Sequence, residues 1–362
     1  MKYRLSILKY SLLVFLMTSL FSCSNSQKSR IKYKPDVSDI KTEVEILRFD
    51  KDLAALDSSN IEQGLEKLQE KYGVFLKTYF VELLNDGRPL EMVEIAKGFL
   101  SIPETKQLFD SIQKTYPDLS FLEKDISEMQ KYKIHYFGKA FFNFNKVYTF
   151  HSLYKYGAFA LDNYAGIGLD FFLGENHIGY MAVETLRPQY RRRTLTKEHI
   201  TAALAAAMAD DIVNQSNKIT GSHLLDAMIV EGKKFFIKAS LMPLAADSVI
   251  YNFTNYQVEY CNKSEAGLWE HLGKENLLYS SKKSEFMKYI TEGPFNPQIN
   301  LPGNSASWLG AQIIFQNAAR MRQDIKKANP GLSAREIDRR VMKAILEESE
   351  VQKFIQKYKP KK

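Results

Sequence analysis

Hydrophobic residues recur at helical spacing along most of this chain, and the pattern is densest over residues 224–242. At 3.6 residues per turn, one face of that stretch is mostly apolar or small and carries a single charge. Its members are Leu224, Ala227, Met228, Glu231, Phe235, Ala239 and Met242. A carboxylate on the core-facing side of a helix is costly unless it is paired, hydrogen-bonded or bound to a ligand. Glu231 is therefore the first candidate functional residue.

Further helical patterns cover the N-terminal third and most of the chain after Thr196, including a capping box at Ser333 and Glu336. Residues 133–175 differ, because aromatic residues, glycine and β-branched residues alternate there with short polar breaks. This composition predicts a small antiparallel sheet. Asp170 lies in its most apolar segment and is a second candidate for a buried acid. We expect an α+β fold that is mainly α-helical, with the sheet inserted in one large domain.

The N-terminus has the features of a bacterial export signal. Lys2, Arg4 and Lys9 precede an apolar run of about a dozen residues, too short to span a bilayer permanently. The run ends in Leu-Phe-Ser-Cys, which resembles a lipobox whose cysteine, Cys23, receives the lipid. We expect a signal peptide over residues 1–22 and lipid attachment at Cys23, with acyl chains such as palmitate. A flexible tether is expected over residues 23–35, followed by a single globular domain over residues 36–358.

Charge and cysteine content add little to this interpretation. Loss of residues 1–22 would lower the formal net charge from +8 to +5, and a lysine-rich C-terminus accounts for much of the excess. Export argues against a nucleic-acid partner. Cys261 is the only other cysteine, so no intramolecular disulfide is expected after lipidation. Glycine-rich phosphate-binding loops and a Gly-x-Ser-x-Gly elbow do not occur in the sequence.

Several short segments, in this order and spacing, resemble the B-type gliding-motility lipoproteins (the GldB-like family). They are residues 225–233 (Leu-Asp-Ala-Met-Ile-Val-Glu-Gly-Lys), 257–261, 269–271 (Trp-Glu-His), 277–279, 294–296 (Pro-Phe-Asn) and 308–310 (Trp-Leu-Gly), together with the lipobox and residues 167–174. The resemblance covers essentially the whole chain. Asn304 and Ser305, after the Pro302-Gly303 turn, depart from the more basic, glycine-containing turn expected of relatives, and this puts any partner contact of that turn in doubt.

The same region also resembles a zinc-peptidase scaffold that has lost its ligands. In such enzymes one helix carries His-Glu-x-x-His and the next supplies a glutamate, often followed by glycine, as third ligand. Glu231-Gly232 fits the third ligand, but the preceding helix offers Leu204 and Met208 where imidazoles would stand. No His-x-x-x-His pair occurs among the six histidines. We therefore expect a degenerate zincin-like helical body with no metal ligands, no catalytic residues and no cofactor.

Candidate cleft or partner contacts follow from these patterns. They are Asp170, Asp211, Asp226, Glu231, Trp269, His271 and Trp308. For Glu231, a partner such as a lysine, arginine or tyrosine is expected, with Asp211 on the neighbouring helical stripe.

Three functions remain open. The resemblance implies a lipid-anchored cell-envelope protein of the gliding-motility or associated secretion machinery, which contacts the membrane through Cys23 and acts on other envelope proteins without catalysis. Its tether lacks the acidic run common in surface-displayed relatives, so we expect the body to face the periplasm. The alternatives are a periplasmic binding module, with a cleft between the helices that start near Thr196 and Leu224, and a residual zinc-peptidase-like hydrolase.

Overall fold

The computed structural model describes residues 33–56, 58–88, 90–296 and 301–361. The chain divides into Met1–Lys32 and Tyr33–Lys362, and the description below concerns the second unit. The expected signal peptide, Cys23 and most of the expected tether lie outside the described residues.

The described chain is mainly helical, as predicted. The helices between the first and second strands of the main sheet are α2 (Phe49–Ala54), α3 (Ile61–Tyr72), α4 (Val74–Lys77), the π-helix η3 (Thr78–Leu84), α5 (Met92–Ser101), α6 (Pro103–Thr115) and α7 (Ser120–Phe137). The helices after the last strand of that sheet are α8 (Gln189–Arg192), α9 (Ile200–Ser216), α10 (Leu224–Leu241), α11 (Asp247–Tyr251), α12 (Asn255–Lys274), α13 (Lys283–Ile290), α14 (Ser305–Ala328), α15 (Ala334–Glu347) and α16 (Val351–Ile355). The predicted capping box at Ser333 and Glu336 opens α15.

The main sheet is mixed, so the prediction of an antiparallel sheet was wrong in strand direction. Its strands β1 (Glu45–Leu47), β2 (Lys146–Phe150), β3 (Ala158–Ala160) and β4 (Tyr164–Gly168) lie in the order β1-β2-β4-β3. The pairs β1–β2 and β2–β4 are parallel, and only β3–β4 is antiparallel. The long helical connection from β1 to β2 permits a parallel pairing that no local turn pattern could reveal. A separate antiparallel pair joins β5 (Phe295–Asn296) to β6 (Leu301–Pro302).

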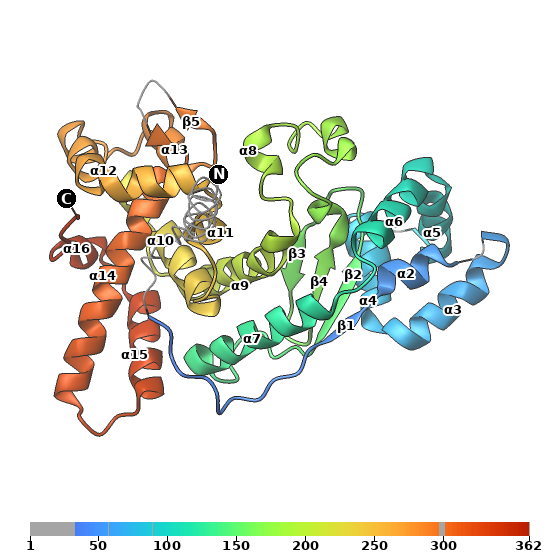
Figure 1. Ribbon diagram of the computed structural model, residues 1–362, viewed down its shortest axis with the longest axis horizontal. Helices are drawn as coiled ribbons and strands as arrows, with labels where there is room; N and C mark the ends of the chain where they lie inside the picture. Colours follow the sequence, from blue (N-terminus) through green and yellow to red (C-terminus); the bar gives the residue numbers. More distant parts are fainter. Residues whose placement is uncertain (1–32, 57, 89, 297–300, 362) are drawn as a thin grey trace, which may run out of the picture. The chain divides into compact units, whose positions relative to one another are not determined.

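Helices α2–α6 lie to one side of this sheet and bury an aromatic core against it (Figure 1). Phe75 stacks on Tyr148 of β2 with ring centroids 4.3 Å apart, and Phe49 meets Tyr79 edge to face at 4.7 Å. Such pairs add about 0.5–1.5 kcal/mol each beyond the burial of their area.

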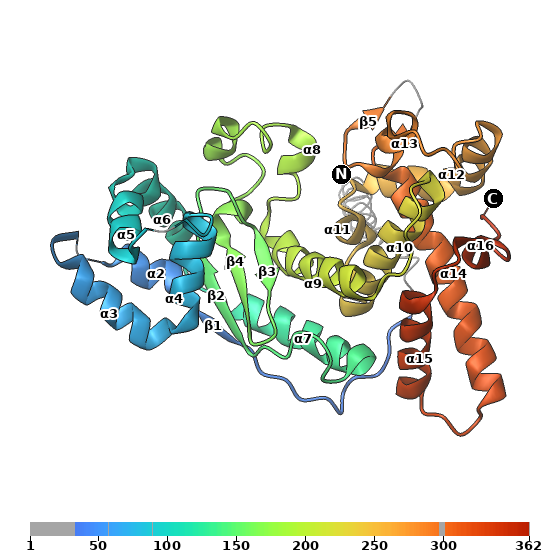
Figure 2. The same ribbon diagram turned by 180° about the vertical axis from the view of Figure 1, so that it is seen from behind.

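Beyond the β3 edge, α9 lies along β3 and leads to α10, which packs against α9 and most closely against α14 (Figure 2). Helix α10 also contacts α7, α11, α13 and α16, so several elements surround it. Among the described residues, no helix is long and apolar enough to cross a membrane.

The described chain begins at Tyr33, whose hydroxyl donates to the buried carboxylate of Asp338 at 2.6 Å. Arg322 of α14 donates to the same carboxylate from Nε at 2.7 Å and also stacks its guanidinium 3.4 Å above the Tyr33 ring. Nε2 of His135 on α7 lies 2.7 Å from the carboxylate oxygen that accepts from Tyr33. These contacts lower the pKa of Asp338 although its burial alone would raise it. These contacts hold the start of the described chain against α7, α14 and α15.

Candidate functional site

The motif Glu231-Gly232 lies where α10 crosses α14 at very short range. A β-carbon on Gly232 would stand 2.5 Å from the carbonyl carbon of Gly310, and one on Gly310 would stand 1.9 Å from the carbonyl oxygen of Met228. Such distances leave no room for any side chain, so glycine is required at both positions. Two of the segments that carry the family resemblance, around Gly232 and around Gly310, therefore meet as a packing contact.

Glu231 is half-buried, not directed into the core as the helical stripe predicted. Its Oε1 accepts from Nζ of Lys234 at 2.8 Å, and the same ammonium lies 3.2 Å from Oδ1 of Asp210 on α9. Burial lowers the pKa of Lys234, but its hydrogen bond to Glu231 and the nearby charges outweigh this and raise that pKa. The expected cationic partner of Glu231 is present, and the ion pair bridges α9 and α10.

On α9, the positions where a zinc peptidase would carry its histidines are apolar and packed. Leu204 and Met208 are completely buried. Within the described ranges, no group of three or more His, Cys, Asp or Glu side chains is placed to hold a metal ion. The chemistry available at this face is that of an ion pair and an apolar interface.

Asp170 is fully buried at the carboxyl end of β4, as the sequence predicted. Its Oδ2 accepts from the backbone N–H of Ser152 at 3.1 Å and of Tyr154 at 2.6 Å, while Oδ1 has no hydrogen-bond partner among the described residues. Burial raises the pKa of Asp170 to about 7, against the effect of those N–H groups. Leu153 and Tyr154 have φ of 54° and 61°, an unfavourable left-handed conformation for such side chains. The Asp170 carboxylate therefore stabilises a strained turn by accepting hydrogen bonds from two of its backbone N–H groups.

His151 starts this turn. It is fully buried, with its ring 4.3 Å from that of Phe109 and 5.0 Å from that of Phe99. Neither ring nitrogen has a hydrogen-bond partner in the described part of the chain. Burial lowers the pKa of His151 to about 3, so the imidazole is neutral at physiological pH. No substrate reaches either His151 or Asp170 in this conformation, because both are fully enclosed.

Two further candidates are acids near the α9–α10 connection. Asp226, in the first turn of α10, accepts from the backbone N–H of His223 at 2.9 Å and so satisfies an amide at the start of the helix. Asp211 is exposed on α9, where burial of part of its carboxyl and the neighbouring Asp210 raise its pKa. The structure gives Asp226 a capping role and leaves Asp211 accessible from solvent.

The remaining candidates lie on α12 and α14. Trp269 meets Tyr358 edge to face at 5.3 Å, and Nε2 of His271 lies 2.9 Å from the hydroxyl of Tyr289. Trp308 is buried to 1 % exposure, so a partner could not reach it in this conformation. The predicted residues thus fall into separate regions and do not form one cleft.

Two buried lysines of α10 were not anticipated. Nζ of Lys233 donates to the carbonyl oxygens of Leu346 and Glu348 at 3.2 and 2.9 Å, which caps the C-terminus of α15. Nζ of Lys238 donates to the carbonyl of Val249 at 3.0 Å. Burial lowers the pKa of each lysine to about 8. Their acceptors lie in other elements, so periodicity along α10 could not identify these roles.

These features define a mainly helical α+β protein in which the segments around Gly232 and Gly310 serve helix packing. A family model described as "Gliding motility protein GldB" matches residues 30–360. The chain therefore belongs to the GldB family of gliding-motility lipoproteins, which associates it with the cell envelope. No curated protein and no solved structure matches it.

Proposed function

We propose that this protein is a lipid-anchored component of the gliding-motility or associated secretion machinery, with its body in the periplasm, and that it acts by contacting other envelope proteins without catalysis. Family membership supports the setting. The observation that supports a contact role is the use of the Glu-Gly motif, in which Gly232 admits α14 and Glu231 pairs with a lysine of its own helix. Glu231 and Gly232 form a motif that could have supplied a metal ligand. In this protein Glu231 forms an ion pair and Gly232 forms a helix-packing contact.

The lipid anchor at Cys23 is proposed from the sequence alone. It is compatible with the fastening of Tyr33 by Asp338 and Arg322, since a pull on the tether would be transmitted directly to α14 and α15. Ten residues lead from Cys23 to Tyr33, which allows at most about 35 Å between membrane surface and body. The anchored body would therefore remain close to the membrane.

Replacement of Cys23 tests the anchor. Cys23→Ala is expected to move the protein from the membrane fraction to the soluble envelope fraction, whereas Cys261→Ala, which removes the only other cysteine, is expected to leave fractionation unchanged. Unchanged membrane association of Cys23→Ala would reject the anchor.

A binding module is the second candidate, and one pocket favours it. A cavity of about 290 Å³ lies between α7, the start of α9 and the segment after α10, lined by Asp125, Glu128, Glu198, Leu241 and Leu244 among others. It includes the start of α9 and the end of α10, but α7 and residues 242–249 form most of its lining, so it differs from a cleft between α9 and α10. A small ligand that raises the melting temperature of the protein, but not that of a Leu244→Glu variant, would favour this function.

Hydrolysis by a residual zinc site is the third candidate. Elemental analysis of full-length protein purified without chelators tests it directly. Stoichiometric zinc together with cleavage of unstructured peptides would replace the contact proposal, and metal-free, inert protein would support it.

A further inference from the structure

An open groove lies between the end of α7, the end of α9 and one side of α15. Its volume is about 500 Å³. We call it the α7–α15 groove. Its lining includes Tyr136, Phe141, Lys218, Arg339 and Met342. None of the packing contacts described above gives this groove a structural role, so its chemistry requires separate consideration.

One part of the groove is apolar and well supported. Phe137 and Phe141 meet edge to face with ring centroids 5.8 Å apart. Met342 and Leu346 of α15 are buried and line the opposite wall. Met342 and Leu346 support the wall from below, and the partly exposed rings of Phe137 and Phe141 offer a preformed apolar surface to an extended or helical segment.

The groove carries an excess of positive charge. Lys218, Arg339 and Lys343 line it, and Glu347 is the only acidic residue in the lining. Glu347 lies 3.9 Å from Lys343, a weak and exposed pair. No carboxylate of the described chain lies within ion-pair distance of Lys218. Arg339 donates to the backbone carbonyls of His135 and Ile134. Lys218, without an acidic partner, and Lys343, with only this weak one, therefore offer their charge beside an aromatic surface.

The loop that supplies Phe141 is held in a costly conformation. Phe141 and Phe142 have φ of 57° and 44°, and for non-glycine residues this left-handed conformation costs roughly 1–2 kcal/mol each. The buried Lys133 stabilises the loop by donating from Nζ to Oδ1 of Asn143 at 2.8 Å. Backbone strain of this kind concentrates at ligand-binding segments. Here the strained loop presents an aromatic ring to the groove.

We propose that the α7–α15 groove binds an acidic, amphipathic segment of a partner protein, with its apolar side chains on Phe137 and Phe141 and its carboxylates near Lys218 and Lys343. This inference deepens the proposed contact function and rests on it. Two basic segments of this chain have the wrong charge to be the occupant: residues 28–32 carry Lys28, Arg30 and Lys32, and lysines crowd residues 353–362. A concave, aromatic surface also fits a peptide better than the flat surface of a membrane.

The test uses full-length protein in detergent and a fluorescein-labelled probe peptide in which Glu-Leu-Phe-Asp is repeated three times. Fluorescence anisotropy is expected to show saturable binding that weakens as salt is added. A double reversal, Lys218→Glu with Lys343→Glu, is expected to weaken binding about tenfold or more, because each change replaces attraction by repulsion. Both side chains are exposed, so the variant is expected to keep the melting temperature of the parent.

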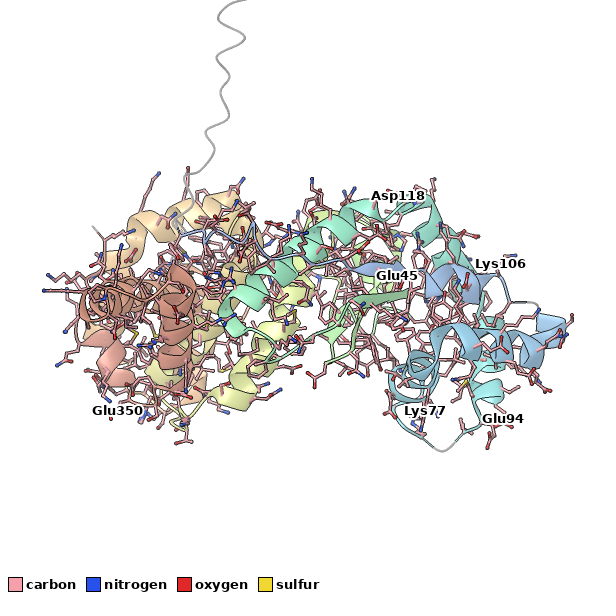
Figure 3. The ribbon with its side chains drawn as sticks, turned by 90° about the horizontal axis from the view of Figure 1, so that it is seen from below. Glu45, Lys77, Glu94, Lys106, Asp118 and Glu350 are labelled. Atoms are coloured by element: carbon pink, nitrogen blue, oxygen red, sulfur yellow. The ribbon has the colours of Figure 1, made fainter. Side chains whose placement is uncertain are left out.

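The matched control is Lys106→Glu on α6 with Lys97→Glu on α5, which alters the net charge equally. Lys106 lies at the opposite end of the described chain from α15 (Figure 3). It is expected to bind the probe like the parent. A second peptide with lysine in place of both acids is expected not to bind. Equal weakening in both double variants, binding of the basic peptide, or absence of binding by the parent would each overturn the proposal.

Two other occupants are distinguished in the same series. Co-sedimentation with phosphatidylglycerol vesicles that is lost only in the groove variant, without peptide binding, would assign the groove to a membrane and overturn the proposal. A dimer that dissociates only in the groove variant would assign it to a second copy of this chain, with the same consequence.

Failure of the groove and failure of the contact function give different results. If anchored protein cross-links to envelope proteins equally with and without the groove reversal, the contact function stands and the groove proposal fails. If neither form cross-links to any envelope protein, the contact function itself fails.

Discussion

Gly232 of α10 and Gly310 of α14 face each other at a backbone-to-backbone crossing in which neither tolerates a β-carbon. Because the obstructing atoms belong to main chain, the two helices would have to separate to admit even alanine. The crossing joins two segments that lie far apart in the sequence and that both carry the family resemblance. Helix approach is therefore one physical reason for their sequence pattern.

The first prediction concerns this crossing. Gly310→Ala is expected to destabilise the protein by at least about 2 kcal/mol, since overpacking against backbone cannot be relieved by side-chain rotation. Chemical denaturation followed by circular dichroism measures the change. Gly267→Ala on α12, where a β-carbon would meet nothing within 4 Å, is the control and should be neutral or stabilising by up to about 1 kcal/mol. Equal stability of Gly310→Ala and the parent would contradict the packing account.

Glu231 is expected to matter much less than its place in the motif suggests. Its ion pair with Lys234 is partly exposed, with 36 % of the Glu231 side chain accessible. Glu231→Gln should change the free energy of unfolding by no more than about 1 kcal/mol, as is usual for such pairs. A loss of several kcal/mol would show that Glu231 has a role that its visible contacts do not explain.

Asp170 should make stability depend on pH between about 4 and 7. Its pKa is raised from 3.8 to about 7 in the folded protein, so between these values the folded state binds more protons than the unfolded state. Stability from this group is complete below the unfolded pKa and is lost as pH rises through the folded pKa, by up to about 4 kcal/mol. Asp170→Asn should flatten this part of the melting-temperature profile.

The comparison variant for Asp170 is Asp162→Asn, an exposed acid in the connection between β3 and β4. Its profile should follow that of the parent throughout. If Asp170→Asn and the parent have parallel profiles from pH 4 to pH 8, Asp170 is ionised in the folded protein across that range and the assignment is wrong.

Asp338 is expected to be the most sensitive of the charged residues described. Asp338→Ala would leave the guanidinium of Arg322, largely buried, without its carboxylate and would release Tyr33, at a cost of about 3–5 kcal/mol. Asp39→Ala, which removes the exposed partner of Arg335, should leave stability almost unchanged. Proteolysis near Tyr33 should also accelerate only in the Asp338 variant. Similar stability of the two variants would argue against this fastening role.

Helices were predictable from sequence where one face alone is buried, and they were harder to interpret where several elements surround them. The 3.6-residue pattern correctly located α10, but α10 is covered on many sides, so Glu231 fell on a half-buried face while Lys233 and Lys238 went inside. A lysine can be buried when carbonyl groups accept its hydrogen bonds. For Lys233 and Lys238 these carbonyls belong to segments that are distant in the sequence and are brought close only by folding.

Strand direction and the α7–α15 groove escaped prediction for a related reason. The partner of β1 is β2, which follows only after the whole N-terminal helical region, and no local turn chemistry encodes that pairing. The groove combines Phe141, Lys218 and Lys343 from three distant stretches. By contrast, Asp170 was found correctly as a buried acid, because its apolar neighbours lie beside it in sequence.

The central claim is that the lipid-anchored protein contacts other envelope proteins. Cross-linking in cells that express full-length protein at its native level tests this claim most directly. The account predicts that a defined set of envelope proteins cross-links to the parent and to Cys261→Ala, and that this set is lost with Cys23→Ala. An unchanged set with Cys23→Ala, or no envelope protein cross-linked to the parent, would contradict it.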